Sequence, residues 1–352
     1  MISILIPIYN VERYIGQCCQ ALFSQTYDRI EYVFVDDCSP DKSVDILLQT
    51  LEQYPQRKAQ VKLLRHDCNR GSGAARATAI AAATGRFVMF ADSDDLLPPD
   101  AVEQLADRQR QTEADIVDGA AVYFSSASPA AVIPQPVQSV SPFGNEAIAK
   151  SLRPTHFSSH SYLQLLLCHC RVSATVWGRL YRRSLFLRDD VCFREGIDYA
   201  EDQSIMPRLM YGSTRAWTDA VVYCYRNDAA DSYTNRQLSD KSRQSYLRAM
   251  SEVYRFFLAH DRDGRYRLPL EIGMAGVYRE CRRMRSPLSE ADAIVAFCPV
   301  TLTGRLLMSV MRSRLPYRAA DTAYRTVRLI YTLPIKLGTM GAVAKCGWWH
   351  IV

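Results

Sequence analysis

The sequence has no apolar run long enough to cross a membrane, so we expect no membrane-spanning helix. A spanning helix needs about 20 consecutive apolar residues, whereas a run such as Ile2 to Ile8 is far shorter. Because the N-terminus leads directly into that run, we also expect no secretion signal and a cytoplasmic location.

Zinc-site spacings and a disulfide framework are also missing. The eleven cysteines are odd in number and scattered, and neither Cys18-Cys19 nor Cys168-x-Cys170 is matched by further pairs at metal-site spacing. We therefore expect reduced thiols. The histidines, such as His156, fit no familiar metal site either.

The glycine-rich turn of a dinucleotide-binding domain does not follow the first apolar run. Pro7-Ile8-Tyr9-Asn10 stands where G-x-G-x-x-G would bring the backbone close to a pyrophosphate. A dinucleotide-dependent oxidoreductase is therefore a poor interpretation. No recognition motif supports nucleic acid as a partner.

What the sequence does contain is an alternation of strand-like and helix-like segments. Strands are expected over residues 2–8, 31–35, 61–64, 87–91 and 115–118, and helices over 13–24, 42–53, 73–84 and 98–111. Such alternation indicates a parallel sheet covered by helices, and ligands gather beyond the carboxyl ends of its strands. The polar clusters lie at those ends: Tyr9-Asn10, Asp36-Asp37, Asn69-Arg70-Gly71 and Asp92 to Asp95.

The most informative stretch is residues 87–95, an apolar run that ends in carboxylates. Asp92 and Asp94 are two residues apart, so a regular strand would direct both to one side. Clustered carboxylates repel one another, and Mg²⁺ or Mn²⁺ with their preference for oxygen ligands would relieve that repulsion. An acidic turn without a ligand is the alternative.

Five spaced blocks resemble family-2 glycosyltransferases of the GT-A fold, roughly over the first 115 residues. The blocks are residues 3–10, 24–27, 31–39, 69–76 and 85–95, and a shorter match covers 196–202. The resemblance implies that Pro7 and Tyr9 line the base pocket and that Asp37 accepts a hydrogen bond from uracil. It also implies these further roles: Asn69, Arg76 and Ser93 border the nucleotide sugar, Asp94 and Asp92 bind the metal, Asp202 is the catalytic base, and Trp177 and Glu201 lie near the acceptor.

Each of these residues has a structural alternative. The alternatives are an aromatic lid on the sheet edge for Tyr9, helix capping for Asp36, Asp37 and Asp202, a solvated helix face for Arg76, and a core position for Trp177.

The end of the chain differs in charge from the rest. Residues 301–352 contain eight Arg or Lys residues and one acid, Asp321, together with apolar residues at helical spacing and a Trp348-Trp349 pair. This pattern suits an interfacial helix on anionic lipid, or a helix packed on the catalytic domain. Between the two ends we expect a loop over 125–150 and helices over 157–183 and 239–260.

With 352 residues, 48% of them hydrophobic and 23% charged, the chain is long and apolar enough to fold around a sizeable core. The predicted class is α/β: a Rossmann-like mixed sheet of the GT-A type flanked by helices. Residues 1–225 form the catalytic domain, with 1–115 as the nucleotide-sugar half and 116–225 as the acceptor half, and 226–352 form a helical extension. The predicted function is inverting, metal-dependent transfer of a sugar from a nucleotide-diphosphate sugar, a UDP-sugar, to a glycan or lipid-linked acceptor. A non-catalytic relative that binds a nucleotide sugar or a partner is the alternative.

Overall fold

The computed structural model describes residues 1–125, 151–152, 157–169, 172–227, 239–283, 287, 289 and 301–344. Residues 126–150 of the loop expected over 125–150 lie outside these residues, as do His156, Cys170 and the Trp348-Trp349 pair. The described chain divides into two compact units, and neither is continuous in sequence. The first comprises residues 1–154, 175–201 and 212–238, and the second 155–174, 202–211 and 239–352.

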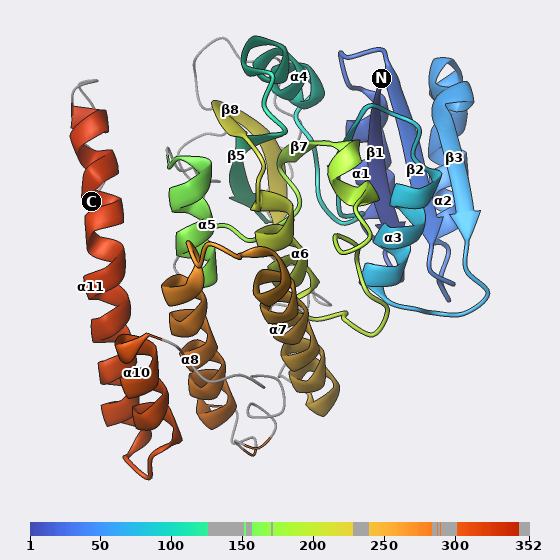
Figure 1. Ribbon diagram of the computed structural model, residues 1–352. Helices are drawn as coiled ribbons and strands as arrows, with labels where there is room; N and C mark the ends of the chain where they lie inside the picture. Colours follow the sequence, from blue (N-terminus) through green and yellow to red (C-terminus); the bar gives the residue numbers. More distant parts are fainter. Residues whose placement is uncertain are drawn as a thin grey trace. The chain divides into compact units, whose positions relative to one another are not determined.

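The first unit is built on a mixed sheet, in which eight strands are described (Figure 1). In order of position the sheet runs β3 (Val61–Arg65), β2 (Ile30–Asp36), β1 (Ile2–Ile8), β4 (Phe87–Phe90), β7 (Arg179–Arg182), β5 (Ile116–Phe124) and β6 (Ser151–Leu152), while β8 (Arg215–Arg226) pairs with β5. The strands β3, β2, β1 and β4 are parallel, and β7 lies antiparallel to both β4 and β5. The predicted mixed sheet is therefore confirmed.

Strand register brings the expected polar clusters to one edge. Ile8 pairs with Asp36, and Asp36 pairs in turn with Arg65. On the other side of β1, Leu5 pairs with Phe90. The segments that follow β1, β2, β3 and β4 therefore leave the sheet at the same edge, because parallel strands share their direction.

Alternating isoleucines explain why β1 is central. Ile2, Ile4, Ile6 and Ile8 join one core cluster with buried residues of α1 (Ile15–Phe23), α2 (Ser43–Glu52) and α4 (Ala101–Thr112). The alanine-rich α3 (Ser72–Ala82) packs against β1 and β2, because small side chains allow close approach. Two short 3₁₀ helices, Pro55–Gln60 and Arg183–Leu187, complete the described elements of this unit.

The prediction of a long helix over 157–183 is wrong in its second half. The helix α5 ends at Leu167, and Arg179–Arg182 forms β7 instead. The pairing explains the difference, since Leu180 lies between Met89 of β4 and Val117 of β5. Pairing with a buried strand on each side stabilises the extended conformation more than the local sequence pattern stabilises a helix.

The second unit is helical. It contains α5 (Ser159–Leu167), most of α6 (Glu201–Met210), α7 (Asp240–His260), α8 (Arg267–Arg283), α10 (Leu302–Arg312) and α11 (Tyr317–Ala344). The helices α5, α7, α10 and α11 all contact α8. The helix expected over 239–260 is confirmed as α7. No helix among the described residues combines the length and the apolar character that a bilayer crossing requires.

Candidate functional site

The acidic turn after β4 is held by its last aspartate. Asp95 is 1% exposed, and its carboxylate accepts hydrogen bonds from the Tyr223 hydroxyl (2.8 Å) and the Arg226 amide (2.7 Å). The same tyrosine oxygen accepts a hydrogen bond from the amide of Asp92 (3.0 Å). Burial, together with the negative charges of Asp94 and Asp92, raises the pKa of Asp95. Asp95 therefore fixes the turn and leaves Asp92 and Asp94 as the carboxylates available to a ligand.

The surroundings of Asp94 disfavour the ionised form of its carboxyl group. Burial, and after it the charge of Asp92, raises its pKa to about 6. A cation bound beside the two carboxylates would offset both effects.

Arg226 positions the backbone of Asp94, and the sequence analysis did not select it. This side chain is 2% exposed, and its Nε donates to the carbonyl of Asp94 (2.7 Å) while Nη2 donates to Gln17 (2.8 Å). The guanidinium lies over the rings of Tyr14 and Phe124, 4.9 and 4.5 Å from their centroids. The available signal was weak: an arginine that follows the apolar residues 220–225 at the end of β8.

Arg76 joins the acidic turn to the start of α6. Its guanidinium bonds Asp92 at 2.8 Å and Glu201 at 2.6 Å, and the Ser72 hydroxyl also donates to Glu201 (3.2 Å). Because Arg76 is only 4% exposed, the alternative of a solvated helix face is wrong. Two predicted site residues, Asp92 and Glu201, thus both form ion pairs with the buried guanidinium of Arg76.

The other residues predicted to bind the nucleotide sugar lie at or beyond the ends of β1, β3 and β4. Pro7 is half-buried within β1, and Tyr9 just beyond it is 47% exposed. Asn69 is exposed in the segment between β3 and α3, while Ser93 is buried in the acidic turn. The exposed Tyr9 ring offers a face on which a planar base could stack.

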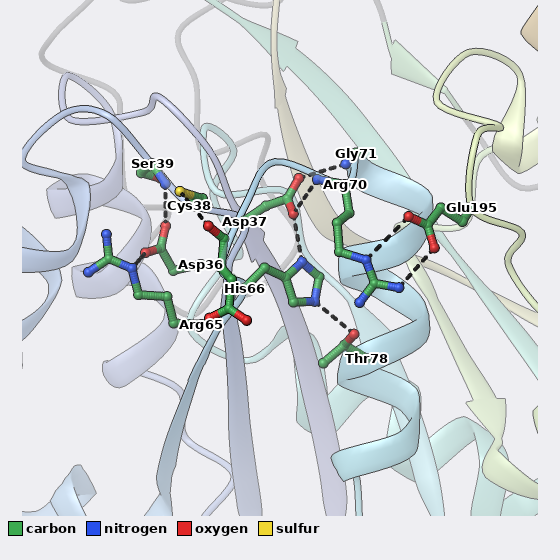
Figure 2. Close-up of polar contacts among 11 residues, drawn as sticks. Asp36, Asp37, Cys38, Ser39, Arg65, His66, Arg70, Gly71, Thr78 and Glu195 are labelled. Carbon is green, nitrogen blue, oxygen red and sulfur yellow. Dashed lines mark hydrogen bonds and ion pairs between the residues drawn. The ribbon is translucent and has the colours of Figure 1, made fainter.

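Asp36 and Asp37 have different surroundings (Figure 2). Asp36 accepts a hydrogen bond from the Ser39 amide (2.8 Å) and pairs with Arg65 (3.1 Å), so it organises the turn after β2. Asp37 accepts from the amides of Arg70 (2.9 Å) and Gly71 (2.7 Å) and contacts His66 Nδ1 (2.6 Å). A carboxylate has about four acceptor positions, so Asp37 keeps one for a further donor such as a base N–H.

The turn that Asp37 holds requires glycine. Gly71 has φ of +89°, and a Cβ there would lie 1.8 Å from an oxygen of Asp198. Only glycine combines this backbone conformation with such close approach.

Trp177 lies in the core of the first unit. It is 8% exposed and stacks on Tyr223, with ring centroids 4.5 Å apart and an angle of 10° between the planes. That ring face is covered and cannot stack on a sugar. Asp202 is the second residue of α6 and directly follows Glu201 in the chain.

The residues present fit a divalent cation that is shared with a ligand. Within the described residues, no group of three or more His, Cys, Asp or Glu side chains could enclose a metal by itself. Mg²⁺ and similar ions are commonly held by one or two carboxylates plus phosphate oxygens. Asp92 and Asp94 provide such a pair, and burial, followed by the charge of Asp92, raises the pKa of Asp94.

The mixed sheet, its flanking helices and the acidic turn after β4 define an α/β domain of the GT-A fold. A solved structure supports this assignment: residues 1–349 of S. aureus TarS, in complex with UDP-GlcNAc, superpose with a TM-score of 0.55 at 19% identity, over 95% of this chain and 92% of that one.

Sequence comparisons relate the chain to glycosyltransferases. Residues 3–168 match the sequence model of glycosyl transferase family 2. The chain is 31% identical over 229 residues to the uncharacterized glycosyltransferase EpsJ of Bacillus subtilis, covering 65% of this chain and 61% of EpsJ. It is 35% identical over 119 residues to the poly(ribitol-phosphate) beta-glucosyltransferase of Bacillus spizizenii, covering 34% and 18%. The chain spans about three fifths of the length of the first curated relatives it matches.

Proposed function

We propose that this protein is an inverting, metal-dependent glycosyltransferase that uses a UDP-sugar as donor. The acceptor is a hydroxyl of a glycan or a lipid-linked precursor in surface polysaccharide synthesis. One observation carries the proposal: the buried Arg76 connects Asp92, beside the strained carboxylate Asp94, to Glu201, the residue before Asp202. The complex of a GT-A relative with UDP-GlcNAc and the glucosyltransferase name of another relative are consistent with it.

The donor would bind along the carboxyl edge of the sheet. Tyr9 would stack on the base beside Pro7, and the remaining acceptor position of Asp37 would take the base N–H. Asn69 and Ser93 would contact the nucleotide sugar, and Arg76 would face the diphosphate.

Asp94 and Asp92 would hold Mn²⁺ or Mg²⁺, which supplies positive charge opposite the departing diphosphate. The Asp202 carboxylate would accept the proton of the acceptor hydroxyl while the hydroxyl oxygen forms its bond to the anomeric carbon. The bond from that carbon to the diphosphate breaks on the opposite side, so configuration inverts. No covalent enzyme intermediate is needed.

Donor hydrolysis tests this function without a known acceptor. A panel of UDP- and other nucleotide sugars is incubated with the protein, with Mn²⁺ or with a chelator. We expect slow, metal-dependent release of UDP from a UDP-sugar. Binding of UDP without any turnover of any donor, with or without added glycan acceptors, would instead support the non-catalytic relative.

We also propose peripheral contact of the helical extension with the anionic inner face of the cell membrane. Apolar side chains of α10, of α11 and of the segment between them are exposed beside basic ones. The exposed large apolar residues are Leu302, Leu306, Leu315, Leu329, Ile330 and Leu333, and the exposed basic residues are Arg305, Arg312, Arg314, Arg318, Arg325 and Lys336. Exposed leucines with adjacent arginines suit the headgroup region of anionic lipid.

Liposome flotation tests the membrane contact. We expect the chain to float with vesicles that contain anionic lipid, and the double variant Leu329→Ser, Ile330→Ser to float less. The matched change of a half-buried position on the same helix, Val327→Ala, should keep flotation. Equal behaviour of all three proteins, or equal flotation on neutral vesicles, would remove the proposal.

A further inference from the structure

A hydrogen-bonded row of three side chains lies beneath the turn that leads into α3. His66, which is 8% exposed at the end of β3, contacts Asp37 through Nδ1 (2.6 Å) and the Thr78 hydroxyl through Nε2 (2.9 Å). Asp37 is 2% exposed. Figure 2 shows the imidazole between the aspartate and the threonine.

In the hydrogen bond between His66 and Asp37, the donor can be assigned. A carboxylate oxygen accepts hydrogen bonds, so His66 Nδ1 must carry the hydrogen that points to Asp37. In the neutral ring, Nε2 then accepts from Thr78. Thr78, in the middle of α3, thus fixes the ring orientation, and the ring fixes the carboxylate.

The carboxylate transmits this orientation to the backbone. The oxygen that His66 contacts, Oδ1, also accepts from the Arg70 amide, and Oδ2 accepts from the Gly71 amide. Without His66, Asp37 can rotate about its terminal bond, since two main-chain donors on adjacent residues leave that rotation partly open. Both the turn and the remaining acceptor position would then lose their direction.

We infer that His66 is a positioning residue for the nucleotide: it acts through Asp37 and sets the geometry of the turn at Arg70 and Gly71. It is not a catalytic residue, because both of its ring nitrogens are engaged, by Asp37 and by Thr78. The inference rests on the proposed function for its ligand, a uridine diphosphate, but not for the hydrogen-bond arrangement itself.

Two amide substitutions separate the two ends of the imidazole. His66→Asn places an amide nitrogen near the position of Nδ1 and can still donate to Asp37. His66→Gln places its amide near Nε2, so it keeps Thr78 and loses Asp37. The two variants are similar in polarity, and each serves as the control for the other.

The primary experiment is calorimetric binding of UDP in the presence of MnCl₂. Loss of a hydrogen bond to a charged group weakens binding by about tenfold or more, so we expect about a tenfold higher Kd for His66→Gln. His66→Asn should stay within about twofold of the unaltered chain. Thr78→Val removes the hydrogen bond to Nε2 but keeps the Nδ1 donor to Asp37, so we expect the Kd for UDP to rise by about threefold. In steady state the loss should appear in KM of the donor and leave kcat unchanged.

Hydrogen exchange at the amides of Arg70 and Gly71 gives a readout that needs no ligand. We expect faster exchange at these two amides in His66→Gln and unaltered exchange in His66→Asn. If both variants exchange and bind like the unaltered chain, or if both lose protection and binding equally, the positioning role is wrong. If the unaltered chain fails to bind UDP, the proposed function fails, and the exchange data alone decide the role of His66.

Discussion

The two units of this protein use buried charge in different ways. In the sheet unit, charged side chains gather at the strand ends and are imperfectly compensated: burial and the neighbouring carboxylates raise the pKa of Asp94 to about 6 and also raise the pKa of Asp95. In the helical unit, by contrast, a fully buried carboxylate has hydrogen-bond donors beside it. Glu271, fully buried in α8, accepts hydrogen bonds from the amide and hydroxyl of Thr301 at the start of α10.

This contrast between the two units indicates which of them binds a charged ligand. Uncompensated charge costs stability and persists where a ligand supplies the missing partner, whereas matched charge contributes to folding alone. Substitutions in the sheet unit should therefore reduce activity more than stability, and those in the helical unit should do the reverse.

The largest expected effect comes from Asp202→Asn, which removes the proposed base and keeps the shape of the side chain. We expect sugar transfer to slow by about 10³-fold, with UDP binding unchanged, as measured by product formation and calorimetry. Asp107→Asn, at an ion pair on the surface of α4, is the control and should keep full activity. Loss of UDP binding in Asp202→Asn without a change in rate per bound donor would make Asp202 structural.

The next effect is that of Asp94→Asn on metal-dependent binding. The amide cannot supply the negative charge that a divalent cation requires, so we expect UDP affinity in Mn²⁺ to fall by about 10²-fold. Measured in a chelator, the variant and the unaltered chain should bind UDP equally weakly. A difference in the chelator that is as large as the difference in Mn²⁺ would assign Asp94 to the nucleotide and not to the metal.

A smaller effect, on stability and not on binding, is expected for Glu271→Ala in the helical unit. The substitution leaves the amide of Thr301 without its acceptor and opens a small cavity beside Gly304. The free energy of unfolding should fall by about 2 kcal/mol, as measured by urea denaturation. UDP affinity should not change, and Glu52→Ala on the surface of the sheet unit should alter neither quantity.

The smallest effect is a difference in acid sensitivity between the units. Burial, with Arg328 and Arg279 acting in the same direction and Glu280 against them, lowers the pKa of His169 in the helical unit to about 4 from an ordinary value of 6.5. In the sheet unit, burial alone would raise the pKa of Glu31, but hydrogen bonds from Lys62, Ser3 and Thr84 outweigh it and lower that pKa to about 2 from 4.5.

The sign follows from proton binding. For both groups the folded state binds fewer protons than the unfolded state between the two pKa values, so stability falls as the pH falls through that window. His169 should lose its contribution between about pH 6.5 and 4, and Glu31 between about pH 4.5 and 2. Thermal scans should show that the Tm of His169→Asn falls less than that of the unaltered chain when the pH is lowered from 6.5 to 4.5. Asparagine also tolerates the positive φ of 52° at this position. An unchanged pH profile would contradict the assignment.

The sequence predicts the first four strands and their edge of polar residues because both depend on local patterns. The alternating isoleucines of β1 and the acids after β4 are readable in a window of about ten residues. The antiparallel β7 is not, because its place is decided by β4 and β5, which come from distant parts of the chain.

The same reasoning applies to the site. Asp92, Asp94 and Arg76 were recognisable from motifs, and the structure shows that Arg76 joins Asp92 to Glu201. His66 and Arg226 were missed because each acts on a residue far away in sequence: His66 on Asp37, and Arg226 on Asp94. Neither has a local pattern that distinguishes it from an ordinary polar residue at a strand end.

A crystal structure of the chain with UDP and Mn²⁺ would test the proposed donor site most directly. We expect an anomalous manganese peak beside the Asp94 carboxylate and the diphosphate of UDP, with the uracil ring against Tyr9. A diphosphate bound elsewhere, or an Asp94 carboxylate that turns away from the metal, would contradict it.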